Sequence, residues 1–113
     1  MPRTSRKKGP ECSYHIMCRS ISEVDLFRDE EDKEYYLTLL KRYKEKYECA
    51  IIAYSLMENH LHLYLNPMGF DVSTFMQCVN TAYVVYFNNK YKRHGPLFQG
   101  RFASKIIETD AYA

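Results

Sequence analysis

Residues 50–66 read AIIAYSLMENHLHLYLN, and the pattern in this stretch sets the prediction of the fold. Two runs rich in aliphatic and aromatic residues flank a short link at 57–59, which indicates two antiparallel strands joined as a hairpin. Alternate residues of a strand point to opposite faces of a sheet. His60, His62 and Tyr64 are therefore expected on one face, with the intervening leucines on the other.

The segments around the hairpin complete an alternation of strands and helices. Apolar residues at helical spacing predict a helix over 27–48, with Asp29 as its cap, and a second helix over 72–91. Residues 14–21 and 101–108 are predicted as the first and last strands. This β-α-β-β-α-β order is the ferredoxin-like plan, an α+β fold with a four-stranded antiparallel sheet and both helices on one face.

Length and composition bound the organisation of the chain. At 113 residues it suits one domain, and we expect a basic flexible arm over 1–10 followed by a single folded domain over 11–113. No apolar run is long enough to span a bilayer, and no signal-peptide pattern follows the basic start, so we expect a cytoplasmic protein with no membrane partner. The four cysteines form no Cys-x-x-Cys pair, which favours reduced, structural thiols.

Charge is divided unevenly along the chain, although the net charge is only +2. Residues 1–10 carry four basic groups and no acid, and residues 11–71 carry seven basic against twelve acidic groups. Residues 72–107 carry five basic groups and again no acid. Basic segments near tyrosines suit a polyanion such as nucleic acid, while a solvated surface of uneven charge is the alternative.

His60 and His62 are candidates for holding one metal ion between them, the alternative being packed or hydrogen-bonded strand residues. Neutral imidazole is the commonest metal ligand in proteins. Zinc usually takes three or four protein ligands, which no nearby cluster supplies, so the pair better suits Mg²⁺ or Mn²⁺ acting on a phosphodiester. His15, on another predicted strand, and His94, in a turn, are predicted not to be ligands.

Two blocks of the sequence resemble a known family. AYSLMENHLHLYL (53–65) resembles the His-hydrophobic-His motif of HUH single-tyrosine, IS200-like transposases. YFNNKYKRHGPLFQGRF (86–102) resembles the segment after the second helix in REP-associated tyrosine transposases. The start MPR, the strand YHIMCR and the helix start FRDEEDKEYYLTLL fit the same pattern, so the resemblance covers nearly the whole chain.

The resemblance implies a DNA transposase domain whose substrate is single-stranded or hairpin DNA. His60 and His62 would hold Mg²⁺ or Mn²⁺ at the scissile phosphate, and a tyrosine would attack to leave a 5′-phosphotyrosyl link. That link keeps the bond energy needed to join a second DNA end. DNA contacts are expected from the arm and from the second block, namely Arg3, Arg6, Lys7, Lys8, Arg93, Gln99 and Arg101. Gln99 has turn geometry as an alternative role, and pairing of two copies is left open.

The resemblance does not identify the attacking tyrosine among the residues of this chain. The family carries it on a helix after the last strand, in a Tyr-Ile-x-x-Asn-Pro-like run, and IETDAYA (107–113) matches only the approach to that helix. We therefore expect the tyrosine beyond Ala113 in a longer protein, with Tyr112 a packing residue rather than the nucleophile. Such a chain would bind DNA and a divalent ion without cleaving.

Two other functions stay open at this stage. One is a non-catalytic nucleic-acid-binding module of the same fold that has lost the chemistry, and the other is a small metal-dependent hydrolase. Most of the eleven tyrosines are expected in the two helices. Tyr64 shares the histidine face and is expected to shape the site.

Overall fold

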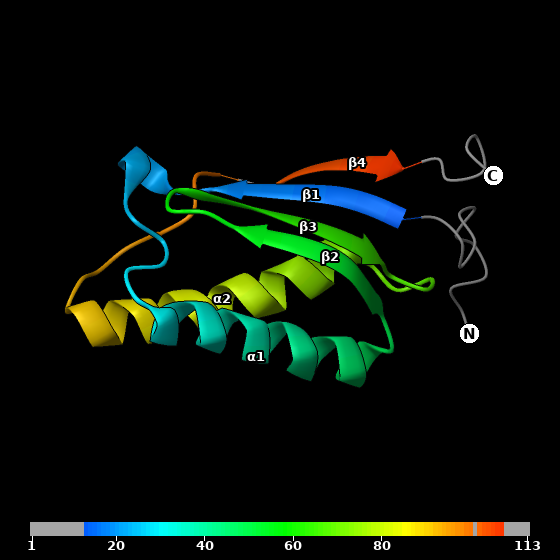
Figure 1. Ribbon diagram of the computed structural model, residues 1–113, viewed down its shortest axis with the longest axis horizontal. Helices are drawn as coiled ribbons and strands as arrows, with labels where there is room; N and C mark the ends of the chain where they lie inside the picture. The colour runs from blue at the N-terminus through cyan, green and yellow to red at the C-terminus, as the bar shows by residue number, and fades with distance from the viewer. Residues whose placement is uncertain (1–12, 101, 108–113) are drawn as a thin grey trace.

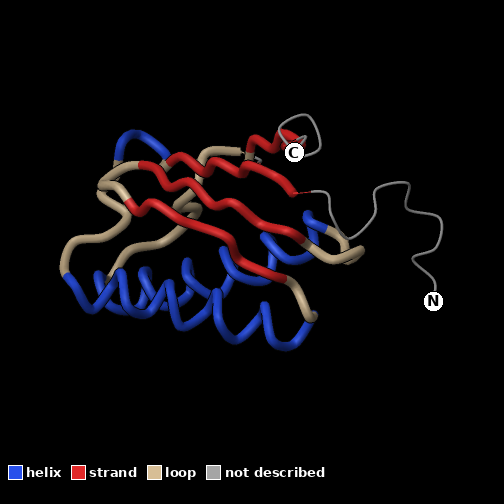
Figure 2. The backbone as a smooth tube through the Cα atoms, turned by 45° about the vertical axis from the view of Figure 1, so that its right-hand side comes forward, coloured by secondary structure: helices blue, strands red, loops and turns tan. Residues whose placement is uncertain are grey.

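A computed structural model describes residues 13–100 and 102–107 of the chain, the last five of these by their backbone. Two long helices form one layer and the strands form a second layer, as both views show (Figures 1 and 2). The elements in chain order are β1 (Ser13–Arg19), η2 (Ile21–Glu23, a short 3₁₀ helix), α1 (Glu30–Tyr47), β2 (Ala50–Leu56), β3 (His60–Asn66), α2 (Val72–Tyr91) and β4 (Ala103–Ile107).

The strands pair antiparallel in the order β2-β3-β1-β4, so that β3 and β1 are the central strands. Along the β1–β3 pair, His15 lies opposite Tyr64, and Arg19 lies opposite His60. Residues directly opposite each other in an antiparallel pair point to the same face. The pairing therefore places His15 and Arg19 on the same side of the sheet as the histidines of β3.

The prediction of a four-stranded ferredoxin-like sheet is corrected in the number of strands and in the bounds of the first and last strands. The strands with described side chains, β1, β2 and β3, form a three-stranded antiparallel sheet over the helices, and of β4 the structure gives only backbone pairing with β1. Of the predicted strand over 101–108, the structure describes β4 as Ala103–Ile107 and Phe102 as outside it, after a turn at Gly100 with a left-handed φ of 54°; residues 101 and 108 lie outside the described residues. β1 ends at Arg19 because Ser22, with φ of 50°, cannot continue an extended strand. The α+β class is found.

β3 separates apolar from polar side chains by strict alternation, as predicted. Leu61, Leu63 and Leu65 are fully buried against the helices. His60, His62 and Tyr64 are half-buried on the other face, which we call the open face. Because a slip of one residue would exchange the two sets, burial of the leucines holds the histidines on the open face.

Large aromatic side chains fill the space between the helices and the sheet. Tyr36 and Tyr83 are fully buried with their rings 5.2 Å apart in an edge-on contact. Their hydroxyls are satisfied, since Tyr36 donates to Asn80 Oδ1 at 2.8 Å and Tyr83 donates to the carbonyl of Leu26. Two tyrosines predicted for the helical stripes are therefore core residues with paired polar tips.

Both long helices begin at an aspartate cap. Asp29 accepts a hydrogen bond from the amide of Asp32 at 2.9 Å, as predicted, and Asp71 accepts one from the amide of Thr74 at 3.1 Å. α2 ends at Tyr91, where Lys92 adopts a left-handed φ of 54°. Within the described residues, neither helix combines the length and apolar character needed to cross a bilayer.

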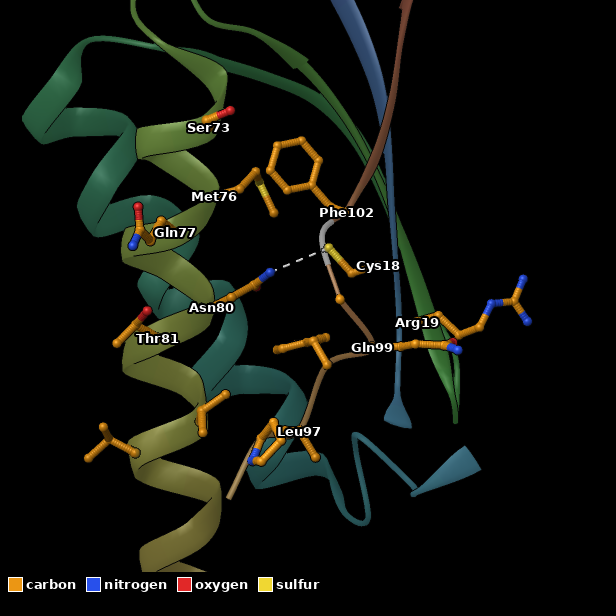
Figure 3. A pocket seen from close by; sticks show the side chains of 15 residues that line it. Cys18, Arg19, Ser73, Met76, Gln77, Asn80, Thr81, Leu97, Gln99 and Phe102 are labelled. Carbon is orange, nitrogen blue, oxygen red and sulfur yellow. Dashed lines mark hydrogen bonds between the residues drawn. The ribbon is translucent and has the colours of Figure 1, made fainter. Parts of the chain in front are cut away.

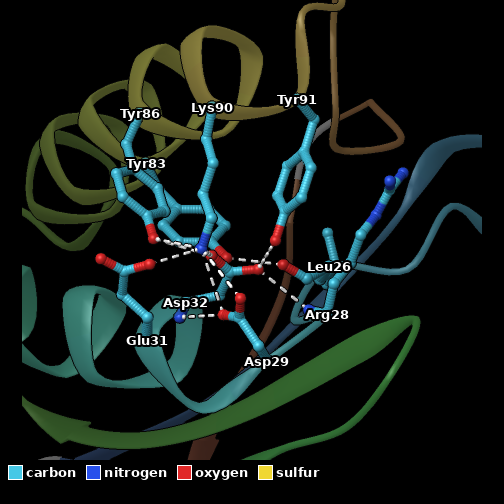
Figure 4. A network of polar contacts seen from close by, with 9 residues as sticks. All are labelled: Leu26, Arg28, Asp29, Glu31, Asp32, Tyr83, Tyr86, Lys90 and Tyr91. Atoms are coloured by element: carbon cyan, nitrogen blue, oxygen red, sulfur yellow. Dashed lines mark hydrogen bonds and ion pairs between the residues drawn. The ribbon is translucent and has the colours of Figure 1, made fainter.

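A polar network joins the start of α1 to the end of α2 (Figure 4). Asp32 is fully buried, forms an ion pair with Lys90 at 2.9 Å, and accepts hydrogen bonds from the hydroxyls of Tyr86 and Tyr91. Burial alone would raise the pKa of Asp32, but hydrogen bonds from Tyr91, Lys90 and Tyr86 outweigh it and lower the pKa to about 2. Glu31, 2.7 Å from Lys90, and Asp32 together raise the pKa of that lysine.

Replacing Asp32 by asparagine should destabilise the fold, because it removes the charge that pairs with Lys90 and turns one of the two buried acceptor oxygens into an NH₂ donor that faces other donors. We expect Asp32→Asn to lower the free energy of unfolding at pH 7 by about 3–5 kcal/mol, measured by urea denaturation. The folded pKa lies below the ordinary value of 3.8, so this stability is present above pH 3.8 and is lost as the pH falls through about 2.

Glu31→Gln is the matched control, because this partner of the same lysine is 72% exposed. Exposed ion pairs contribute less than about 1 kcal/mol. Equal losses in the two variants would contradict the central role given to Asp32.

Candidate functional site

The predicted histidine pair lies on the open face at the N-terminal half of β3. The ring centroids of His60 and His62 are 5.1 Å apart, and the ring planes are nearly perpendicular, at 86°. Both side chains are half-buried, so each ring has one side supported by the sheet and another reachable from solvent. The expectation that both rings leave the sheet on the same, solvent-reachable side is met.

Each ring of this pair has its Nδ1 atom engaged in a hydrogen bond. His60 Nδ1 lies 2.9 Å from Asn59 Oδ1, and His62 Nδ1 lies 2.8 Å from His15 Nε2. A carboxamide oxygen can only accept, so His60 carries its proton on Nδ1 and, when neutral, presents the lone pair on Nε2. Among the described residues, the Nε2 atoms of His60 and His62 have no hydrogen-bond partner, which leaves both available to a ligand.

His15, which was predicted not to be a metal ligand, lies in this cluster. Its ring stacks on Tyr64 with centroids 4.5 Å apart and planes 1° from parallel, and it stacks on His62 at 5.0 Å. The antiparallel pairing of β1 with β3 brings His15 beside the pair despite its distance along the chain. The signal that would have found His15 is the alternation of β1, in which Ile16 and Cys18 face the core and His15 the open face.

Arg19 is a further site residue that the sequence analysis missed. It is exposed, lies opposite His60 in the strand register, and accepts a 2.7 Å backbone hydrogen bond from the amide of Gln99. The side chains of Arg19 and Gln99 extend together, away from α2 (Figure 3). Gln99, a predicted DNA contact, therefore lies beside Arg19, which in turn lies opposite His60 in the strand register.

The remaining predicted DNA contacts are placed elsewhere or lie outside the described residues. Arg93 sits just after α2, where its guanidinium donates to Asn88 Oδ1 at 2.9 Å and to the carbonyl of Pro96 at 3.2 Å. It lies in the helical layer and is not brought together with the histidines. His94 is exposed in the following turn. Outside the described residues lie Arg3, Arg6, Lys7, Lys8, Arg101 and the weaker nucleophile candidate Tyr112.

The tyrosines of the helical layer are poor candidates for the attacking group. Burial is the largest cause that raises the pKa of Tyr83 and of Tyr86, the latter to about 12. Tyr91 has a raised pKa for the same reason, with its hydrogen bond to Asp32 adding to the effect. Raised pKa values make a phenol harder to deprotonate, and these side chains lie across the sheet from His60.

A cavity among the described residues has none of the three histidines His15, His60 and His62 in its lining. It has a volume of about 550 Å³ and lies between α2 and residues 96–100 and 102, with Asn80, Arg19 and Gln99 among its lining (Figure 3). Asn80 Nδ2 donates to the buried Sγ of Cys18 at its wall, at 3.4 Å. Arg19 and Gln99 therefore belong both to the wall of this cavity and to the surroundings of the histidine pair.

The donor set of the open face fits a divalent cation that takes two ligands from these residues. No group of three or more His, Cys, Asp or Glu side chains within the described residues is arranged to hold a metal. A structural zinc site would need three or four such ligands. Two imidazole Nε2 atoms beside an exposed arginine instead suit a cation that completes its shell with water and phosphate oxygens.

Comparison with known proteins assigns the family. The family described as "Transposase IS200 like" matches residues 9–112, so the chain belongs to the IS200-like transposase family, as the sequence resemblance indicated. The family is one of transposases and is in general metal-dependent. No curated protein sequence matches the chain.

Solved structures share the fold. A REP-associated tyrosine transposase bound to a REP hairpin has a TM-score of 0.70 and 15% identity, covering 88% of this chain and 59% of that one. A candidate transposase from Deinococcus radiodurans R1 has a TM-score of 0.67 and 14% identity, covering 88% and 82%. The chain thus spans about three fifths of the REP-associated transposase.

If His60 and His62 hold a cation, their joint removal should abolish its binding with little cost in stability. We expect the His60→Ala/His62→Ala variant to lose Mn²⁺ binding in a calorimetric titration. The free energy of unfolding should change by no more than about 1 kcal/mol, since both rings are partly exposed. His94→Ala is the control and should bind as the wild type does. Equal Mn²⁺ affinity in the double variant would remove the site.

Proposed function

We propose that the chain is a transposase domain that binds single-stranded hairpin DNA across the open face of its sheet. There it would hold the scissile phosphate for cleavage and rejoining through a 5′-phosphotyrosine. The observation that carries the proposal is that the half-buried rings of His60 and His62 share one face of the sheet, with the exposed Arg19 opposite His60 in the strand register. Family membership and the hairpin-bound relative support DNA as the partner.

Different residues of the open face would bind the cation and the DNA phosphates. His60 and His62 would hold Mg²⁺ or Mn²⁺ through Nε2, and the bound cation would polarise the phosphodiester and stabilise developing charge. Arg19 would donate to a neighbouring phosphate, because a guanidinium matches phosphate oxygens with two parallel hydrogen bonds. Gln99 would add a neutral donor beside it. Phosphate contacts of this kind position the DNA and carry no sequence information.

The attacking tyrosine is assigned to a position outside the described residues. Of the described tyrosines, Tyr64 is the one that β3 places on the open face, and its ring is stacked on His15. A stacked ring supports the cluster and is not free to reach a phosphate. The cleavage step therefore depends on a tyrosine that approaches the open face from elsewhere.

The same observation keeps a second function in view, a nucleic-acid-binding module of this fold without the chemistry. Both functions need the open face for DNA, and they differ only in whether a covalent adduct forms. Incubating the full-length protein that carries these residues with Mn²⁺ and a 3′-labelled hairpin separates them, because a 5′-phosphotyrosyl link leaves the 3′ part of the cut strand on the protein. A denaturant-resistant protein–DNA adduct supports the transposase, whereas tight binding without an adduct supports the module.

Arg19→Ala should weaken binding of a hairpin with a single-stranded flank, because one phosphate contact is lost. In fluorescence anisotropy, we expect the slope of log affinity against log salt concentration to fall by about 1 in magnitude. Arg42→Ala is the control, since Arg42 is an exposed arginine on α1, in the helical layer. Equal slopes for wild type and Arg19→Ala would contradict the assigned phosphate contact. Lack of preference for the hairpin over duplex of the same sequence would contradict the proposed substrate.

A further inference from the structure

We propose that His15 is a positioning residue: it holds His62 so that the Nε2 atom of His62 can bind the divalent cation. This inference rests on the proposed function, because it concerns the same cation on the open face. His15 would do so by accepting the Nδ1–H proton of His62 on its own Nε2 atom, across the 2.8 Å contact between the two rings.

The chemistry of imidazole explains why such a bond matters. A neutral ring carries one proton and one lone pair on its two nitrogens, and a metal ion takes the lone pair. If His15 donates to Nδ1 of His62, then neutral His62 carries its own proton on Nε2 and cannot ligate through that atom. If His62 donates instead, its lone pair is on Nε2. The direction of this single hydrogen bond therefore decides whether His62 can bind.

The surroundings of His15 hold its ring in place for this role. The stack on Tyr64 is nearly parallel, and the strand register sets His15 opposite Tyr64, two residues from His62. The arrangement matches that of the other ligand, since His60 donates from Nδ1 to Asn59 Oδ1. Histidines that ligate metals commonly donate their second ring N–H to such a partner, which fixes the tautomer and the ring direction.

Two variants separate the nitrogen of His15 from its ring. His15→Phe keeps an aromatic ring for the stack on Tyr64 but removes the acceptor, and His15→Gln restores an acceptor oxygen near the place of Nε2. We expect His15→Phe to weaken Mn²⁺ binding by about 10–100-fold, the range seen when such outer partners are removed. His15→Gln should recover part of this loss. His94→Phe, at the exposed histidine of the turn, should bind as wild type.

A second measurement reads the tautomer directly and needs neither metal nor activity. In the ¹⁵N–¹H spectrum of the imidazoles of the metal-free wild type, we expect His62 to carry its proton on Nδ1. The His15→Phe variant should shift His62 toward the Nε2–H form. His62 protonated on Nε2 in the wild type, or unchanged Mn²⁺ affinity in a folded His15→Phe variant, would overturn the inference.

The two readouts also distinguish this inference from the proposed function. A wild type with the Nδ1–H tautomer that binds neither Mn²⁺ nor hairpin DNA would leave the positioning bond standing and refute the function. A wild type that binds both, with His15→Phe equal to it, would leave the function standing and refute the positioning role.

Discussion

The antiparallel register between β1 and β3 is the constraint on which the site depends. Burial of alternate leucines fixes which face of β3 the histidines occupy, and the pairing then brings His15 and Arg19 of β1 alongside them. No single segment contains the cluster. Shifting either strand by one residue would turn its polar side chains toward the helices, where an unpaired imidazole or guanidinium is costly to bury.

The other face of the sheet keeps most of the acidic groups away from this site. The acids of the first turn of α1 act as caps and as partners of Lys90, and the buried Asp32 is the centre of that network. Part of the acidic excess of residues 11–71 is therefore engaged within the helical layer. The open face presents histidines, Arg19 and Gln99 in its place, a combination compatible with a phosphate backbone.

Local patterns in the sequence were sufficient to predict the helices and strands, but not to predict that His15 and Arg19 join the histidine pair. Alternation predicted the faces of β3, and helical periodicity with an aspartate cap predicted α1 and α2, because these features depend on neighbouring residues. His15 and Arg19 escaped because their role depends on which strands pair, and chain distance does not show this. The end of β1 was placed too far because Ser22 adopts a left-handed φ, which a serine does not signal in the sequence, whereas the left-handed Gly100 before β4 agrees with the turn geometry that was held open there.

These observations make the ligating power of the histidine motif a tertiary property. An isolated imidazole in water exchanges its proton freely between the two nitrogens, so a His-Leu-His sequence alone does not commit Nε2 to a metal. His60 takes its acceptor from the adjacent Asn59, within the same turn of chain, but His62 takes its partner from β1. The tautomer of His60 is therefore fixed by a neighbour in the chain, whereas that of His62 is fixed only after β1 and β3 have paired. Metal affinity should thus follow folding of the β1–β3 pair, which ties the chemistry of the open face to the same register that seals the core.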